Sequence, residues 1–195
     1  MTTAQAHPNI ALVKYWGKQE RSGNLPATAN LSITLAGLTT TTRVTEAAAD
    51  TFVLNDATAE DPKLRRWLET LRGSFDIPPL AIHSSNDFPT SAGLASSASG
   101  FAALITAINA HCELGLDHAM CSEWARVGSA SAARSIFGGF VALVPPKWWA
   151  VPMAKKEHWP LEVVVAVTST EAKGVSSGEG MERSRLTSPY YNAWL

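Results

Sequence analysis

Apolar and polar residues recur with two different periods along the chain, and these periods predict strands and helices in a mixed order. Segments rich in β-branched and apolar residues, bounded by Gly, Pro and Asn, are typical of strands. The pattern gives no assignment for residues 148–152. It predicts strands at residues 7–16, 32–35, 39–45, 51–54, 80–84, 140–144 and 161–167, the last of them in a central position.

Apolar residues three or four positions apart predict four helices. Asp61 followed by Pro62 is typical of an N-cap and a first helical turn, and Asp117 is a second N-cap candidate. Residues 129–135 are predicted to form a small-residue loop or a short helix. The four helices are expected at residues 61–71, from about 93 to 109, after Asp117 through Val127, and from 180 towards Pro189.

This order of elements predicts an α+β fold. No linker or repeat divides the 195 residues, so we expect one domain with a sizeable core. The net charge of −1 offers no basic excess for nucleic acid and no polybasic segment for a membrane surface. Cys112 and Cys121 lack disulfide or zinc spacing, and residues 1–7 do not read as a signal peptide. We therefore expect a cytoplasmic protein with reduced thiols.

A loop of small residues at 88–100 runs directly into the long Ala-rich helix. Free N–H groups and the positive end of the helix dipole make such an N-terminus favourable for anions. Gly93 would let the backbone approach a phosphate closely, and Ser96 and Ser97 add hydroxyl ligands for phosphate or Mg²⁺. Small residues would equally serve close packing of the helix against a sheet, and composition alone leaves both interpretations open.

Two further segments carry groups that bind phosphate. Residues 14–18, KYWGK, place two lysines and a phenol at a predicted strand end, although a solvated strand end is the commoner meaning of a lysine pair. Residues 128–135, GSASAARS, place Arg134 amid small hydroxyl residues, where a guanidinium can meet a phosphate bidentately. The alternative is a tight helix start whose arginine points to water.

These segments resemble a known family. Residues 89–98 read PTSAGLASSA and are similar to the phosphate loop of the GHMP kinase superfamily. The longer stretch 86–98, together with PNIALVKYWGK at 8–18, more specifically resembles the mevalonate diphosphate decarboxylase family. The resemblance extends over residues 7–195. It implies a GHMP-kinase-type N-terminal domain, a ribosomal-protein-domain-like fold in which β-α-β units form two layers.

The resemblance also implies a role for each segment. In the family, the strand end contacts the substrate's diphosphate, and the serines and arginine matching 129–134 surround the diphosphate and the reacting carboxylate. Residues 171–181 resemble a segment that lines the same cleft, although a surface loop would look alike. The chain departs from the family at Ala130 and Ala133, where glycine and cysteine are common. The implied substrate-binding residues are Tyr15, Trp16, Gly17, Lys18, Lys63, Ser129, Ala130, Ser131, Ala132, Ala133, Arg134, Ser177 and Gly178.

Lys18 and Arg134 are the implied catalytic residues. The resemblance assigns ATP to the loop at the start of the long helix, and Mg²⁺ to Ser96 or Ser97 through the bound nucleotide. The residues expected to bind ATP are Gly93, Leu94, Ala95, Ser96 and Ser97.

The family uses ATP and Mg²⁺ to phosphorylate the 3-hydroxyl of mevalonate 5-diphosphate, which then loses phosphate and CO₂ to give isopentenyl diphosphate. Its proposed base is an aspartate that the resemblance places beyond Leu195, because family chains continue into a second half. We therefore expect residues 180–195 to begin a second domain that is absent here, this chain to be inactive by itself, and the full-length form to be a homodimer. Two alternatives stay open: a kinase relative that does not decarboxylate, and a truncated paralogue that binds nucleotide or a partner without catalysis.

Overall fold

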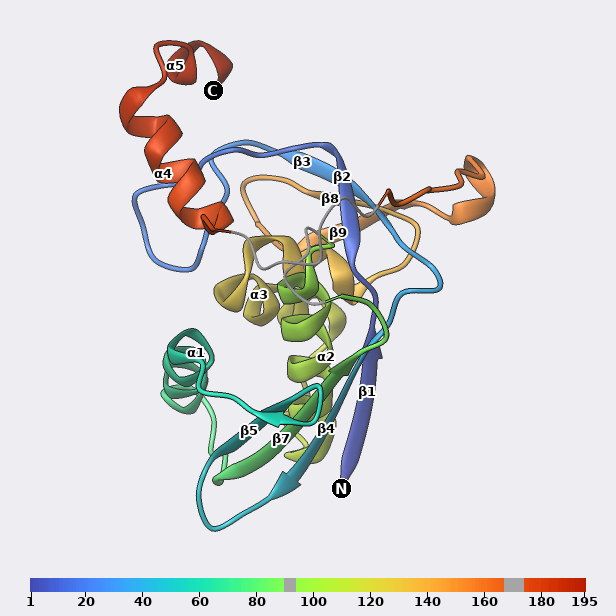
Figure 1. Cartoon of the computed structure of the whole chain (residues 1–195), viewed down its shortest axis with the longest axis vertical. Coiled ribbons are helices and arrows are strands. Elements are labelled where there is room, and N and C mark those ends of the chain that lie inside the picture. The colour runs from blue at the N-terminus through green and yellow to red at the C-terminus, as the bar shows by residue number, and fades with distance from the viewer. Residues whose placement is uncertain (90–93, 167–173) are drawn as a thin grey trace.

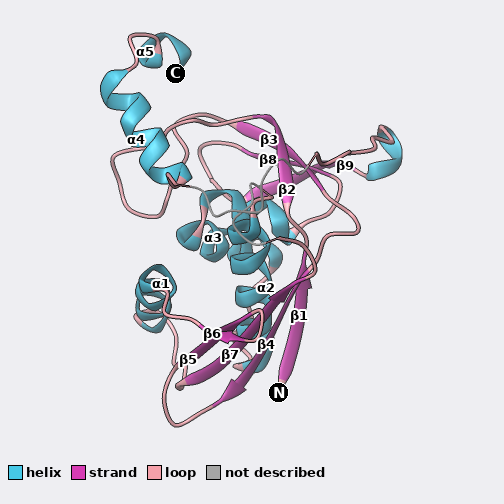
Figure 2. Cartoon of the chain, in the orientation of Figure 1, coloured by secondary structure: helices cyan, strands magenta, loops and turns pink. Residues whose placement is uncertain are grey.

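The computed structural model describes residues 1–89, 94–166 and 174–195, and its strands form two sheets (Figures 1 and 2). The five-stranded sheet has the order β1-β4-β7-β5-β6, antiparallel except where β5 pairs with β7. The four-stranded sheet is antiparallel, with the order β2-β3-β8-β9. The strands are β1 (Thr2–Ala6), β2 (Asn9–Val13), β3 (Asn30–Thr34), β4 (Thr40–Glu46), β5 (Thr51–Leu54), β6 (Ala57–Thr58), β7 (Leu80–Asn86), β8 (Phe140–Leu143) and β9 (Ala150–Ala154).

One helix, α2 (Ser96–His111), occupies the centre of the molecule, with α1 and α3 to one side and β1 to the other (Figure 1). The predicted apolar face at residues 101, 104, 105 and 108 is buried, and so are Ala98, Ala102, Ala103 and Ala107 on the remaining faces. A helix that is apolar nearly all round is typical of a core position. The other helices are α1 (Pro62–Arg72), α3 (His118–Gly128), the 3₁₀ helices η1 (Ala130–Ile136) and η2 (Lys156–His158), α4 (Ser177–Thr187) and α5 (Tyr191–Trp194).

Two helix starts lie where the sequence predicts them. The Asp61 carboxylate accepts hydrogen bonds from the backbone N–H groups of Lys63 and Leu64, and Pro62 opens α1. The Asp117 carboxylate accepts from the N–H of Met120 at the start of α3. These caps involve only near neighbours in the chain, which is why sequence alone locates them. None of the helices within the described ranges combines the length and apolarity needed to cross a bilayer.

Two strand predictions are corrected, and one strand was missed. The strand expected at 7–16 is only β2, Asn9–Val13, because the antiparallel partner β3 begins opposite Val13 and residues 14–18 leave the sheet. The strand β1, with the sequence TTAQA, precedes β2 and was not predicted, because its polar composition does not indicate a strand. The central strand expected at 161–167 is wrong for residues 161–166, which are exposed and in no sheet, while residue 167 lies outside the described ranges. Apolar character favours a strand only where a neighbouring strand offers free backbone groups, and β8 pairs with β9 instead.

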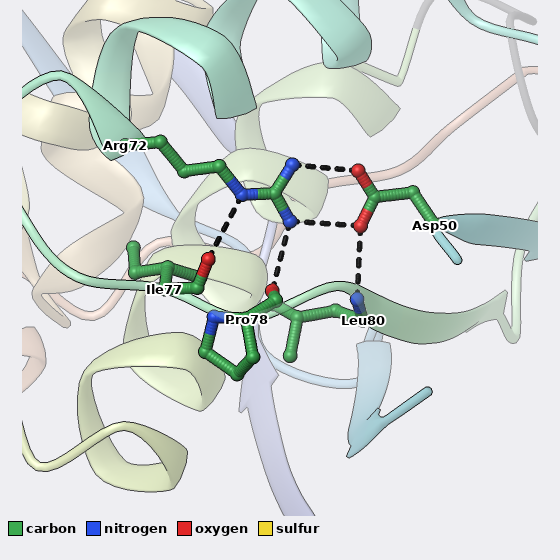
Figure 3. Close-up of polar contacts among 5 residues, drawn as sticks. All are labelled: Asp50, Arg72, Ile77, Pro78 and Leu80. Carbon is green, nitrogen blue, oxygen red and sulfur yellow. Dashed lines mark hydrogen bonds and ion pairs between the residues drawn. The ribbon is translucent and has the colours of Figure 1, made fainter. Parts of the chain in front are cut away.

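A charged junction ties three elements of the five-stranded sheet region together (Figure 3). Arg72 at the end of α1 donates to both carboxylate oxygens of Asp50, at 2.6 and 2.8 Å. The same guanidinium donates to the carbonyls of Ile77 and Pro78, and Asp50 also accepts from the N–H of Leu80. The junction therefore fixes the end of α1 relative to the entries of β5 and β7, and hydrogen bonds from Arg72 lower the pKa of Asp50.

We predict that Asp50→Asn lowers the free energy of unfolding at pH 7 by about 1–2 kcal/mol, less than a buried charged pair would because both groups are partly exposed. The pKa of Asp50 is lower in the folded state, so its contribution is complete above the unfolded value of about 3.9 and is lost as pH falls through the folded value. Urea unfolding of both proteins from pH 7 down to pH 2 measures the difference.

The control for this experiment is Asp76→Asn, which removes an exposed aspartate from the same α1–β7 connection. We expect it to change the unfolding free energy by less than about 0.5 kcal/mol, as surface substitutions usually do. Equal stability of Asp50→Asn and the natural chain at pH 7 would contradict the proposed contribution of this junction.

Candidate active site

A cavity of about 640 Å³ lies where the chain leaves β2, beside η1 and the N-termini of α2 and α4. We call it the large cavity. Lysines, an arginine and serine hydroxyls dominate its polar lining, and no carboxylate is present among its described lining residues. They are Asn9, Ile10, Ala11, Lys14, Tyr15, Trp16, Lys18, Lys63, Ala95, Ser97, Gly128, Ser129, Ala130, Ser131, Arg134, Ser176, Ser177, Gly178 and Met181.

Arg134 is the most unusual group in this lining, because its side chain is only 2% exposed. Its Nε donates to the Ser32 hydroxyl at 2.8 Å and its Nη2 to the Asn9 side-chain oxygen at 3.1 Å. Its Nη1 donates to the side-chain oxygen of Asn30. The alternative in which this arginine points to water is therefore wrong: the sheet strands β2 and β3 hold it inward.

The acceptors around Arg134 are all neutral, and within the described ranges it forms no ion pair. Burial lowers its pKa to about 10, so the guanidinium keeps its charge at neutral pH. A buried cation without a counter-charge is unfavourable, since it loses hydration that neutral dipoles replace only in part. An anion in the large cavity would supply the missing counter-charge.

Tyr15, Lys18 and Lys63 bring further donors to this cavity. Burial raises the pKa of Tyr15, so its phenol stays protonated at neutral pH. Loss of hydration lowers the pKa of Lys18, and it lowers that of Lys63 together with repulsion from Lys18. Lys63 extends from α1 with its ammonium 5.1 Å from the centre of the Phe101 ring. Two lysines that repel each other across one cavity both gain from a shared anion.

The start of α2 meets the large cavity through serine hydroxyls. Ala95, at the N-cap position, has φ 53° and no side chain that could cap the helix. The Ser97 hydroxyl lies 3.3 Å from that of Ser129, which lies 3.4 Å from that of Ser131. The positive end of the α2 dipole and a line of hydroxyls therefore lie along one side of the cavity.

The start of α4 lies against the same cavity. Ser176 and Glu179 form a reciprocal capping box, and Ser177 and Gly178 follow it in the lining. Met181 packs with Tyr15 and Ala130, so α4 is held to the strand end by apolar contact. The part of the 171–181 segment at 171–173 lies outside the described residues.

A second, smaller cavity of about 200 Å³ opens on the other side of the α2 N-terminus. Ser97 lines both cavities, so the start of α2 separates them. The small cavity has a mainly apolar wall from β5, β7, α1 and α2. It is lined by Thr42, Phe52, Leu54, Asp61, Leu64, Ile82, Ser84, Asn86, Ser96, Ser97, Gly100, Phe101 and Leu104.

A family model described as the diphosphomevalonate decarboxylase-like N-terminal domain matches residues 6–147. The chain belongs to this family. The diphosphomevalonate decarboxylase of Candida albicans is 38% identical to it, in an alignment that covers 94% of this chain and 58% of that protein. This chain thus spans less than two thirds of that relative's length.

Solved structures of the family share the fold over nearly the whole chain. Mevalonate diphosphate decarboxylase from Staphylococcus aureus matches with a TM-score of 0.86 and 34% identity, covering 99% of this chain and 62% of that one. The structure of MDDEF in complex with MVAPP, AMPPCP and magnesium matches with a TM-score of 0.87 and 38% identity. The match covers 99% of this chain and 63% of that one. The expected α+β fold of the family's N-terminal part is therefore confirmed.

The structure brings most of the expected site residues of this family member together. Of the expected substrate and nucleotide residues, Gly17, Leu94, Ala132 and Ala133 lie outside the lining of both cavities, and Ser96 lines only the small one. Gly93 lies outside the described residues. Those in the lining of the large cavity are Tyr15, Trp16, Lys18, Lys63, Ala95, Ser97, Ser129, Ala130, Ser131, Arg134, Ser177 and Gly178.

Sequence reasoning missed the residues that hold these groups. Asn9 donates to the carbonyl of Ser131 and the hydroxyl of Ser135 while it accepts from Arg134. Asn30 and Ser32 supply the other acceptors. The available signal was an excess of small polar residues at inward positions of strands that are otherwise apolar. No group of three or more metal-ligating His, Cys, Asp or Glu side chains occurs in the described part of the chain.

Gly17 has a packing role that the structure makes testable. A Cβ added there would lie 2.0 Å from the Tyr191 hydroxyl oxygen, so Gly17→Ala must shift the Tyr191 ring by which α5 packs against this strand end. The neighbouring Trp16 donates to the Ser184 hydroxyl at 2.8 Å, which places α4 against the same strand end. We predict faster amide hydrogen exchange across 177–195 and a loss of stability of about 1–3 kcal/mol, as overpacking typically causes.

Gly138→Ala is the matched control, because an added Cβ there meets no heavy atom within 4 Å. We expect its exchange at 177–195 to equal that of the natural chain. Protection of 177–195 that survives Gly17→Ala unchanged would show that α5 does not depend on this contact.

Proposed function

We propose that this chain forms the substrate- and nucleotide-binding part of an ATP-dependent diphosphomevalonate decarboxylase of the mevalonate pathway. The reaction converts mevalonate 5-diphosphate and ATP to isopentenyl diphosphate, ADP, phosphate and CO₂. One observation carries the proposal: the buried Arg134 cation lacks an ionic partner in the described structure, and it faces a cavity whose described lining has lysines but no carboxylate. That is the charge pattern required by a substrate bearing both a diphosphate and a carboxylate.

The groups of the large cavity suit the two ends of that substrate. Lys18 and Lys63 neutralise the diphosphate, and the protonated Tyr15 phenol donates a hydrogen bond to it without adding charge. Arg134 lies on η1 and Ser129 is its N-cap residue, whereas Lys63 comes to the same cavity from α1. Arg134 is assigned to the reacting carboxylate, whose charge it stabilises until CO₂ leaves.

ATP is assigned to the junction between the two cavities. The α2 N-terminus and the hydroxyls of Ser96 and Ser97 accept the phosphates, since helix N–H groups and serines favour anionic oxygen. The apolar wall of the small cavity, with Phe52 and Ile82, suits a flat base. Mg²⁺ usually takes few protein ligands and the nucleotide's own oxygens, so Ser96 or Ser97 is a sufficient donor. The MDDEF structure in complex with AMPPCP and magnesium supports ATP and Mg²⁺ as ligands.

Positioning and charge neutralisation are what the described residues contribute to phosphoryl transfer. The bound nucleotide supplies the phosphoryl group. Lys18 and the serines hold the substrate so that its 3-hydroxyl faces the α2 N-terminus. Removal of the hydroxyl proton requires a base, and the described lining of the large cavity has no carboxylate. We therefore keep the proposal that an aspartate beyond Leu195 in the family pattern performs this step.

The remaining assignments belong to the same proposal. We assign residues 1–195 to one N-terminal domain, with residues 180–195 as the start of a second domain. The first of these assignments is supported by the matching family model, which describes an N-terminal domain. A homodimer in the full-length form is proposed on the family resemblance alone. A cytoplasmic location is supported by Cys112 and Cys121, which are both free thiols.

We predict that Arg134→Ala weakens binding of mevalonate 5-diphosphate by about 10- to 100-fold, the range for losing a hydrogen bond to a charged partner. Binding of Mg-ATP should change less than about threefold, because this counter-charge serves only one ligand. Isothermal titration of each ligand into the folded chain measures both. Arg134→Lys retains the charge and should lose less affinity for mevalonate 5-diphosphate. Arg65→Ala removes an exposed arginine from α1 and should bind this substrate as tightly as the natural chain. Unchanged affinity in Arg134→Ala would refute the assignment of Arg134.

We also predict that this chain, given Mg-ATP and mevalonate 5-diphosphate, releases no measurable CO₂. A well-placed general base contributes roughly 10²–10⁴-fold, and the described lining offers no carboxylate for that role. The Candida albicans relative serves as the positive control, and products are identified by mass spectrometry. A phosphorylated substrate without CO₂ would indicate the kinase alternative, and binding without ADP release the non-catalytic one. Steady CO₂ release would place the base in this chain and make Asp87 and Glu179 the first to substitute.

A further inference from the structure

The loop that follows Lys18 returns to the same place in the structure. Backbone hydrogen bonds close it at its base, from Gln19 N–H to the Leu25 carbonyl and from Ala27 N–H to the Gly17 carbonyl, both at 2.9 Å. At its tip, Gly23 and Asn24 have φ values of 92° and 53°. Two consecutive left-handed residues reverse the chain, so the Asn24 side chain faces back towards Lys18.

The end of α3 holds this tip in place. Arg126 is 8% exposed, donates from Nη1 to the Gly23 carbonyl, and donates from Nε to the Trp148 carbonyl at 2.9 Å. The Asn24 side-chain amide donates to the Val127 carbonyl. The position of Asn24 is therefore fixed by the helix that leads directly into Gly128 and Ser129 of the large cavity.

The other end of the Asn24 amide meets Lys18. Its Oδ1 accepts a hydrogen bond from the Lys18 ammonium at 2.7 Å. A carbonyl can only accept and an ammonium can only donate, so the two partners leave one orientation for the amide. We propose that Asn24 is a positioning residue that anchors the Lys18 ammonium at the mouth of the large cavity.

The anchor matters because Lys18 is exposed on a long flexible stem. One of its three donors is occupied by Asn24, which leaves the others to be aimed at an anion. The charged and titratable groups that share this cavity with Lys18 are Lys14, Tyr15, Lys63 and Arg134. Tyr15 is neutral, and the positive charges of the other three groups repel the Lys18 ammonium, a repulsion that the Asn24 oxygen opposes. The assignment of a diphosphate to Lys18 rests on the proposed function; the Asn24 contact does not.

The test uses Asn24→Gly and Asn24→Asp in the full chain. Glycine keeps the left-handed backbone and removes the acceptor, whereas aspartate keeps an acceptor and adds a negative charge. The control is Asn55→Gly, an asparagine with φ 49° whose Oδ1 accepts from the Asn86 N–H instead. The first readout is the pKa of the Lys18 amine from nitrogen-15 NMR, with the signal assigned by Lys18→Arg.

We expect the Lys18 pKa to fall further in Asn24→Gly, because the ammonium loses its acceptor, and to rise in Asn24→Asp, because a carboxylate favours the charged form. Asn55→Gly should leave it unchanged. The second readout is titration with inorganic pyrophosphate. Asn24→Gly should bind it roughly threefold to tenfold more weakly, the range of one hydrogen bond, and Asn55→Gly equally well.

The two readouts separate the two hypotheses. A Lys18 pKa that is the same in the natural chain and both Asn24 variants overturns the anchoring role. Failure of the natural chain to bind pyrophosphate counts against the proposed function, while the pKa comparison still decides the role of Asn24. If Asn24→Gly does not fold, Asn24→Asp decides: a Lys18 pKa equal to that of the natural chain would show that the side chain at position 24 does not contact the Lys18 ammonium, and would overturn the anchoring role.

Discussion

The Arg134 guanidinium joins three segments that are far apart in the sequence. It extends from η1 and reaches Asn9 on β2 and Asn30 and Ser32 on β3, so the first strands of the four-stranded sheet and the loop after α3 are held by one planar group. Its acceptors are neutral, and the contact that fixes the wall of the large cavity therefore also leaves it positively charged. The residue that holds the wall in place is thus also the one that we propose to bind the anionic substrate.

Around this point, α2 serves the core and the site with different parts of its length. Its middle is buried on most sides, with Thr106 exposed, which fixes the helix axis against β1 and β4. Its first turn begins at Ala95 without a side-chain cap and separates the two cavities. A rigidly packed helix with an open N-terminus gives phosphate a fixed set of N–H donors, whereas a loop alone would have to be ordered on binding.

Patterns among neighbouring residues in the sequence predicted much of the fold. The caps at Asp61 and Asp117 and the apolar face of α2 depend on residues within one or two turns, so their prediction needed no knowledge of distant partners. Pairing between strands depends on such partners, and there the patterns failed: a polar segment became β1, and the apolar residues 161–166 found no strand to pair with. The same distinction applies to the candidate site, where residues in motifs were predicted and their distant partners were not. Lys18 and Arg134 stand in readable motifs, and so does Asn9, but nothing in its motif indicated that it holds Arg134. Asn24, which holds Lys18, lies outside the quoted motifs.

The sequence by itself determined the starts of α1 and α3 with their caps, the apolar face of α2, the family, and the residue types suited to a phosphate, because each follows from neighbours in the chain or from quoted motifs. The tertiary structure alone decided that Lys63 of α1 shares a cavity with Lys18, and that Arg134 is buried rather than solvated. It also decided that Asn24 reaches both Lys18 and Val127. These facts depend on side chains converging from separate elements, and convergence is set by how sheets and helices pack, which no local pattern of residues encodes.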